Sequence, residues 1–85
     1  MSKSAFTDAY TSVTAALREL RLERRVSQVE LARRLGRPQQ FVSYVESGIR
    51  RIDLVEFTVI VRALGGDPKV LFSTLADGIP DDTGI

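Results

Sequence analysis

The chain has 85 residues, contains neither Cys nor His, and carries a formal net charge of +1. This length fits one domain. The missing thiols and imidazoles exclude disulfide frameworks, thiolate nucleophiles, the usual zinc ligand sets and imidazole as a general base. The sequence also has no Gly-rich phosphate loop and no convergent pair of carboxylates. We therefore expect no cofactor, no metal and no enzymatic activity.

The hydropathy pattern argues against a membrane or secreted protein. No run of about 18 apolar residues occurs, and the first residues, MSKSAFTDAY, lack the apolar core of a signal peptide. The absence of Cys fits a reducing compartment. The sequence thus predicts a soluble, cytoplasmic protein.

Charge is distributed unevenly along the chain. Residues 18–51 contain nine arginines against four glutamates, whereas residues 52–85 contain two cations against six carboxylates. A basic middle and an acidic end favour a molecule in which one face meets a polyanion. Ordinary solvated helix faces would explain the same asymmetry, so the charge pattern leaves both interpretations open.

The first predicted helix runs from about residue 7 or 8 to residue 24. Apolar residues recur along it at three- and four-residue steps, namely Phe6, Tyr10, Val13, Leu17 and Leu20. This spacing indicates one buried face on a long amphipathic helix.

The second predicted helix begins after Ser27, a favourable N-cap residue, and Glu30 stands where it completes a capping box. Val26 and Leu31 are placed to form a hydrophobic staple across this helix start. Gly36 ends the helix, because glycine adopts the left-handed C′ conformation at little cost.

The third predicted helix spans residues 38–47, with Pro38 at its first position and Gly48 as its stop. Val42 and Val45 face the core. The opposite face carries five side chains that can all form hydrogen bonds although none is charged: Gln39, Gln40, Ser43, Tyr44 and Ser47. We call these five residues the polar stripe. A merely solvated helix face usually favours Lys and Glu, so this composition points to a binding surface.

Two further helices follow. Asp53 and Glu56 form a second capping box, and Gly65 ends a helix that is apolar nearly all round. Pro68 opens a short fifth helix that is expected to reach about Leu75, before a polar, acidic end rich in Gly and Pro.

The order of these motifs resembles the XRE family, the phage repressor and Cro type of helix-turn-helix protein. The resemblance covers roughly residues 13–72. It rests on S-Q-x-E-L-A at the start of the second helix, L-G at the turn, Q-x-x-V-S within the third helix, E-x-G at its end, and A-L-G at the end of the fourth. It implies an all-α, five-helix, lambda-repressor-like domain whose helices two and three form the helix-turn-helix, at about residues 27–47. The domain would span residues 8–76, between an N-terminal extension at 1–7 and an acidic flexible tail at 77–85.

The resemblance also assigns roles to individual positions. It implies that four residues of the third helix reach DNA bases in the major groove: Gln39, Gln40, Ser43 and Tyr44. It implies that a second group contacts phosphates: Gln28, Arg37, Arg50 and Arg51. The chemistry agrees, because Gln can pair with adenine N6 and N7, whereas cations and helix N-termini bind phosphate.

Other positions have structural interpretations. Arg21 and Glu46 match a pair that forms an ion pair between helices one and three in the family. Phe41 replaces a small polar residue, and we expect it to pack against the fourth helix or the following loop. Arg33 and Arg34 lie in the middle of the second helix and are interpreted as solvated.

A single recognition helix reads only a few base pairs, so we expect a homodimer on a pseudo-palindromic operator. The predicted interface is the apolar excess of helix four together with residues of helix five: Val70, Leu71, Phe72 and Leu75. The N-terminal turn around Phe6 and Tyr10 is the competing candidate.

The resemblance predicts a small stand-alone transcriptional regulator, a repressor rather than an activator. It would be associated with the nucleoid and encoded by a bacterium or a phage. The alternative is an antitoxin or protein-interaction module in which DNA binding is secondary. The uncharged polar stripe favours DNA binding, since a face without that function would drift toward Lys and Glu.

Overall fold

The structure, a computed structural model, describes the backbone of residues 2–85 and the side chains of residues 9–85. Its helices are α1 (Ser2–Glu23), α2 (Gln28–Leu35), α3 (Gln39–Ser47), α4 (Leu54–Ala63) and α5 (Pro68–Gly78). No strand occurs within residues 2–85, so the expected all-α class with five helices is confirmed. In this part of the chain, no helix is long and apolar enough to cross a membrane.

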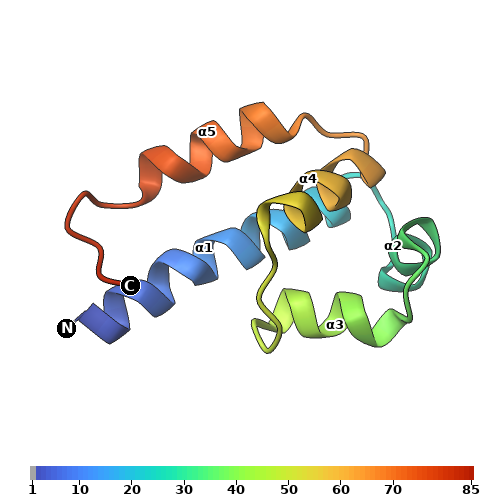
Figure 1. The fold of residues 1–85 in the computed structure, drawn as a ribbon. Coiled ribbons are helices and arrows are strands. Elements are labelled where there is room, and N and C mark those ends of the chain that lie inside the picture. The colour runs from blue at the N-terminus through green and yellow to red at the C-terminus, as the bar shows by residue number, and fades with distance from the viewer. Residues whose placement is uncertain (1) are drawn as a thin grey trace.

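The helices are arranged around α1 and α4, which lie in the middle of the molecule (Figure 1). Helix α3 packs against α1 and α2, whereas α5 packs against α1 and α4. As a result, α3 and α5 lie on opposite sides of the fold. The molecule therefore offers two separate surfaces, one on α3 and one on α5.

The start of α1 and the end of α5 differ from the sequence-based expectation. Helix α1 begins at Ser2, several residues before the expected start, so residues 2–7 are helical rather than an extension. The apolar periodicity begins at Phe6, whereas the helical backbone begins four residues earlier. Helix α5 continues to Gly78, beyond Leu75 and into the expected tail, because nothing breaks it until Ile79, whose helical conformation Pro80 disfavours.

The helix-turn-helix begins and ends with the expected local signals. The Ser27 side chain accepts a hydrogen bond of 3.0 Å from the Glu30 backbone N–H, and Gly36 adopts a left-handed φ of +67°. The Glu30 carboxylate, however, turns toward Arg33 and Arg34 rather than back to the cap. Helix α3 begins at Gln39, one residue later than expected, so Pro38 is its N-cap residue and not its first helical residue. Pro38 has no side-chain donor or acceptor, and α3 lacks a side-chain cap as a result.

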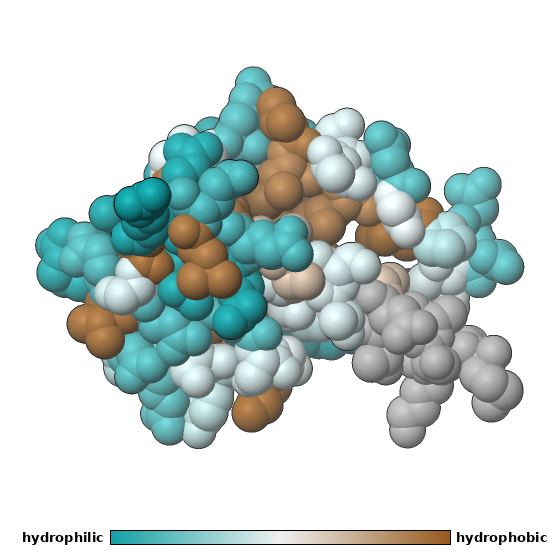
Figure 2. All heavy atoms as spheres, turned by 180° about the vertical axis from the view of Figure 1, so that it is seen from behind, coloured by the Kyte–Doolittle hydropathy of each residue, from teal (hydrophilic) through white to brown (hydrophobic). Residues whose placement is uncertain are grey.

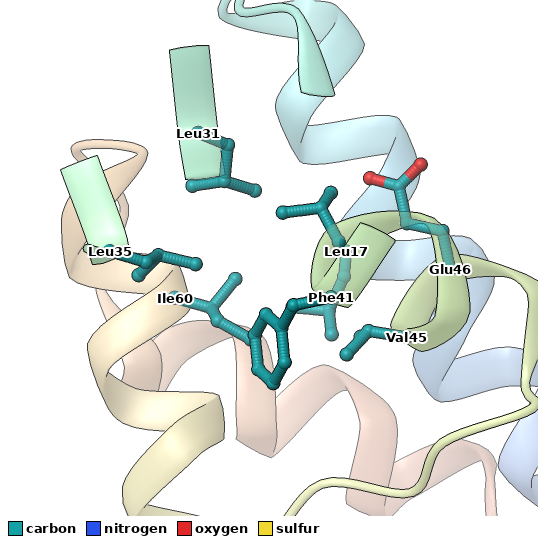
Figure 3. A pocket seen from close by; sticks show the side chains of 8 residues that line it. Leu17, Leu31, Leu35, Phe41, Val45, Glu46 and Ile60 are labelled. Carbon is teal, nitrogen blue, oxygen red and sulfur yellow. The ribbon is translucent and has the colours of Figure 1, made fainter. Parts of the chain in front are cut away.

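The core forms where α3 meets α1, α2 and α4. Figure 3 shows side chains from all four helices converging there, among them Leu17, Leu31 and Ile60. Val42 and Val45 are buried as expected. Phe41 is buried too and lies beside Ile60, which confirms the interpretation that it packs against the fourth helix.

A buried ion pair joins α1 to α3. Arg21 Nε donates to Glu46 Oε2 at 2.6 Å and Arg21 Nη2 donates to Glu46 Oε1 at 3.0 Å. The Arg21 and Glu46 side chains are only 8% and 6% exposed. Arg21 Nη1 also donates to the Val26 carbonyl at 2.9 Å, which fixes the turn before α2. Hydrogen bonding to Glu46 raises the pKa of Arg21. The expected structural pair is thus present, and its bidentate geometry fixes both distance and direction.

The loop after α3 is held by a second, more exposed pair. Arg50 Nη1 and Nη2 donate to the two carboxylate oxygens of Glu56 at 3.1 and 2.8 Å. Glu56 also accepts from the Asp53 backbone N–H at 3.0 Å, as part of the capping box that begins α4. The hydrogen bonds from Arg50 and then from Asp53 hold the pKa of Glu56 below its ordinary value. In the same way, Arg33 and Arg34 lower the pKa of Glu30 to about 2.

Removing one partner of the buried pair is expected to destabilise the fold strongly. Glu46→Ala leaves the Arg21 charge buried without a counter-ion, so the free energy of unfolding should fall by about 3–5 kcal/mol. Urea denaturation followed by circular dichroism measures this loss. Glu30→Ala is the matched control, because its partner Arg33 is 71% exposed and water screens that pair. Equal losses in the two variants would contradict the structural role of the buried pair.

Acid is expected to weaken the ion pairs of Glu30 with Arg33 and Arg34 and of Glu56 with Arg50. Because the folded-state pKa values of Glu30 and Glu56 are lowered from 4.5, the pairs stabilise the fold above pH 4.5. For Glu30 this stabilisation disappears as the pH falls from 4.5 to about 2. The melting temperature of the Glu30→Gln/Glu56→Gln double variant should therefore lie below that of the wild type at pH 7, and the difference should shrink in acid. A difference that stays constant between pH 7 and pH 2 would contradict this expectation.

Candidate nucleic-acid interface

The polar stripe lies on the face of α3 that points away from the core. Gln39, Gln40, Tyr44 and Ser47 are exposed, and Ser43 is half-buried. The residues between them, Phe41, Val42 and Val45, are buried. Helical spacing therefore separates the two faces of α3 completely, with anchors on one side and hydrogen-bonding groups on the other.

A chain of hydrogen bonds connects the polar stripe to the buried ion pair. Gln39 Nε2 donates to Gln28 Oε1 at 2.8 Å, and Gln28 Nε2 donates to Glu46 Oε1 at 3.0 Å. Gln28 thus spans the space between the first turn of α2 and the start of α3. Sequence reasoning placed Gln28 next to a phosphate and missed this link. The link depends on the angle between α2 and α3, which no spacing in the sequence shows.

A second contact lies within the stripe itself. Gln40 Nε2 donates to Tyr44 Oη at 2.8 Å, one helical turn away. The pair restricts two long side chains before any ligand is bound. Each keeps hydrogen-bonding capacity, since the Gln40 carbonyl and the Tyr44 hydroxyl proton are not used by this bond.

The three arginines predicted near phosphates lie in different environments. The exposed Arg37 stacks on the Phe41 ring, with its Cζ atom 4.3 Å from the ring centroid. The exposed Arg51 stacks at the same distance on Tyr10, whose Oη accepts a hydrogen bond from the Ile52 backbone N–H. Arg50 is half-buried in its pair with Glu56. Stacking leaves the in-plane N–H donors of a guanidinium available, whereas a bidentate pair occupies them.

Arg33 and Arg34, interpreted as solvated, form ion pairs with Glu30 on the surface of α2. Arg34 also donates to the Ala63 carbonyl at 2.9 Å, and Arg24 donates to the Gly65 carbonyl at 3.1 Å. Both contacts lie at the C-terminal end of α4, where cations stabilise free carbonyl groups. Part of the positive charge counted in the sequence therefore supports the fold.

The α5 side of the molecule is apolar. Figure 2, a view from behind, shows hydrophobic side chains gathered along its upper part, on the side of α5. Two hollows of about 360 Å³ and 270 Å³ lie there and share Leu54, Phe57 and Phe72 as lining residues. Val70 and Phe72 are exposed, whereas Leu71 and Leu75 pack partly against the core.

Among the residues proposed for an N-terminal interface, the Phe6 side chain lies outside the described side chains. Tyr10 is half-buried and holds the loop before α4 through its contact with Ile52. Within the described part of the chain, no group of three or more acidic, His or Cys side chains is placed to hold a metal ion.

Comparison with known proteins agrees with this geometry. Residues 13–71 match a family described as a helix-turn-helix domain. The fold is similar to the solved structure of an XRE-family like protein from Pseudomonas syringae pv. tomato str. DC3000, with a TM-score of 0.85 and 41% sequence identity. That similarity covers 92% of this chain and 95% of the other. No protein with a curated description matches this chain. The chain therefore belongs to the XRE family of helix-turn-helix DNA-binding proteins.

Proposed function

We propose that the protein is a sequence-specific transcriptional regulator that reads the major groove of double-stranded DNA with α3. The observation that carries this proposal is the polar stripe, an exposed row of uncharged hydrogen-bonding side chains on a helix whose opposite face is buried. The buried pair between Arg21 and Glu46 supports it, because a groove-reading helix must keep a fixed position on its scaffold.

Base readout is assigned to Gln39, Gln40, Ser43 and Tyr44. A Gln amide matches adenine N6 and N7, Ser can donate to or accept from several base edges, and the Tyr ring can pack on a thymine methyl group. Gln28 supports this set, because its hydrogen bond to Gln39 fixes the direction of one reading amide. Ser47 lies at the far end of the stripe and is not included.

Phosphate contacts are assigned to Arg37, Arg51 and the first turn of α2 at Gln28. Free backbone N–H groups at a helix N-terminus attract an anion, and Arg37 and Arg51 are exposed cations whose guanidinium groups lie over aromatic rings. Arg50 fits this role less well, because its pairing with Glu56 already uses Nη1 and Nη2. We therefore assign Arg50 to support of the loop.

A homodimer on a palindromic site is proposed through the α5 side. Val70 and Phe72 form its exposed apolar part, with Leu71 and Leu75 beneath. Lys69 lies at the start of α5 and Asp77 near its end, so an antiparallel pairing of two α5 helices brings opposite charges together. Because α5 lies on the side of the fold opposite α3, this interface leaves both reading helices free (Figure 1).

Repression is the proposed regulatory effect, because it requires only that the operator be occupied. The alternative, a protein-interaction module or antitoxin, would place its partner on the apolar α5 side and leave the polar stripe without a function. The composition of the stripe therefore favours DNA binding.

Loss of a reading amide is expected to reduce specificity. On a duplex selected from a random-sequence pool, Gln39→Ala and Gln40→Ala should each weaken binding by about 10- to 100-fold, since a bidentate base contact contributes about 1–3 kcal/mol. On an unrelated duplex the loss should be small. Arg51→Gln is the contrasting variant and should weaken binding to both duplexes while reducing the salt slope by about 0.9. Fluorescence anisotropy measures all three, and equal losses of the Gln variants on both duplexes would contradict the assigned readout.

A charge on the apolar surface of α5 is expected to separate the dimer. Val70→Glu should weaken self-association by about tenfold or more, because the new carboxylate would be buried without a partner. Val29→Glu on α2 is a matched control, since the two valines are 64% and 65% exposed. Light scattering coupled to size exclusion gives the oligomeric state. A monomeric wild type, free and on DNA, would contradict the dimer, as would dissociation caused by Val29→Glu alone.

A further inference from the structure

The Phe41 side chain contacts two arginines that lie on either side of α3 in the sequence. Arg37 precedes the helix and Arg50 follows it. Their Cζ atoms lie 4.3 Å and 4.9 Å from the centroid of the Phe41 ring. Both distances are within the range of about 6 Å over which a guanidinium is attracted to an aromatic face. One ring therefore connects the two ends of the recognition helix.

The ring is fixed by the core on its other side. Phe41 is buried, and it lines the same internal space as Leu35 and Ile60. Figure 3 shows the ring beside Ile60, between α3 and α4. A hollow of about 140 Å³ beside it is lined by Val55 and Val59 of α4. The position of the ring is thus determined by packing and not by the arginines.

The two arginines differ in what else holds them. Arg50 is clamped by both carboxylate oxygens of Glu56 and donates to the Arg51 carbonyl at 2.8 Å. The Arg37 side chain forms no hydrogen bond and no ion pair with the residues that the structure describes, so its contacts are the Phe41 ring and a longer-range attraction to the Glu56 carboxylate. Its guanidinium lies over the ring face, and the N–H donors in its plane remain available to a ligand.

We propose that Phe41 is a positioning residue that holds Arg37 beside the first turn of α3, ready to bind a DNA phosphate, while Arg50, held by Glu56, supports the same ring. This inference rests on the proposed function. In this arrangement Phe41 itself touches no DNA. Arg37 binds a phosphate, whereas Arg50 supports the loop and the ring.

Stacking on Phe41 reduces the side-chain entropy that Arg37 loses when it binds DNA. A free arginine loses rotamer freedom when it binds a phosphate, and that loss weakens binding. Stacking on a fixed ring restricts the side chain before DNA arrives. This support is important here because Pro38 leaves α3 without a side-chain cap. No polar capping side chain is therefore present at this corner to contact a phosphate beside Arg37.

A double-mutant cycle between Arg37 and Phe41 tests the proposal. The probe is a duplex of mixed sequence that was not selected for binding, because a phosphate contact does not depend on base sequence. Its length of about 20 base pairs equals that of two half-sites. Arg37→Gln and Phe41→Leu should each weaken binding by about two- to fivefold. The double variant should bind no more weakly than Arg37→Gln alone, and Phe41→Tyr, which keeps the ring, should retain wild-type affinity. Ile60→Val is the control for loss of packing in the same contact and should leave affinity unchanged.

Losses that multiply in the double variant would overturn the proposal, as would equal weakening by Ile60→Val. A second measurement needs neither substitution nor DNA. In the folded wild type, the side-chain protons of Arg37 should show upfield ring-current shifts by NMR, and unshifted resonances would also overturn it. Wild-type protein that binds no duplex would contradict the proposed function itself, which is a separate result from normal binding without coupling between Arg37 and Phe41.

Discussion

Arg21 and Glu46 meet in the interior, where each charge is shielded from water and depends on the other. Their two hydrogen bonds join α1 to α3, while the third Arg21 contact fixes the turn before α2. Through Gln28, the same carboxylate connects to Gln39 on the surface. A buried pair of this kind contributes little net stability, because desolvation offsets the attraction, but breaking it is costly. Its effect is to permit one orientation of the recognition helix and to disfavour others.

The arginines of the basic middle segment divide by environment. Several stabilise the fold by binding carboxylates or the carbonyl groups that end a helix, as Arg24 and Arg34 do at the C-terminal end of α4. Arg37 and Arg51 instead lie over aromatic rings and are exposed to solvent. The net charge of this segment therefore does not show which arginines lie at the candidate DNA-binding surface, whereas the environment of each guanidinium does. Aromatic support also gives long side chains a defined position without neutralising their charge.

The local signals of the sequence predicted the helix-turn-helix well. Ser27, Gly36 and the capping box of Asp53 and Glu56 act over a few residues, so their meaning does not depend on the rest of the fold. The alternation along α3 also predicted which side chains are buried. The start of α1 at Ser2 was not predicted, because residues 2–5 precede the periodic apolar pattern, which begins at Phe6.

Contacts between residues that lie far apart in the sequence were harder to predict. The buried ion pair was predicted only through the family resemblance, since nothing in the spacing of Arg21 and Glu46 requires that they meet. The bridge from Gln28 to Gln39 and the stacking of Arg37 and Arg50 on Phe41 were not predicted at all. Each depends on the angle between neighbouring helices, which packing of the whole core determines. The sequence therefore predicted the identity of the candidate reading face, and the structure added how that face is held.

The central claim, that the polar stripe of α3 is the DNA-binding surface, can be tested by NMR. Isotope-labelled protein is titrated with a duplex selected from a random pool, and the changes in amide and side-chain resonances are mapped on the fold. The account predicts that the largest changes occur at Gln28, Arg37, Gln39, Gln40 and Tyr44, while the surface of α5 changes only where dimer formation affects it. Changes confined to α4 and α5, with the side-chain amides of Gln39 and Gln40 unaffected, would contradict it.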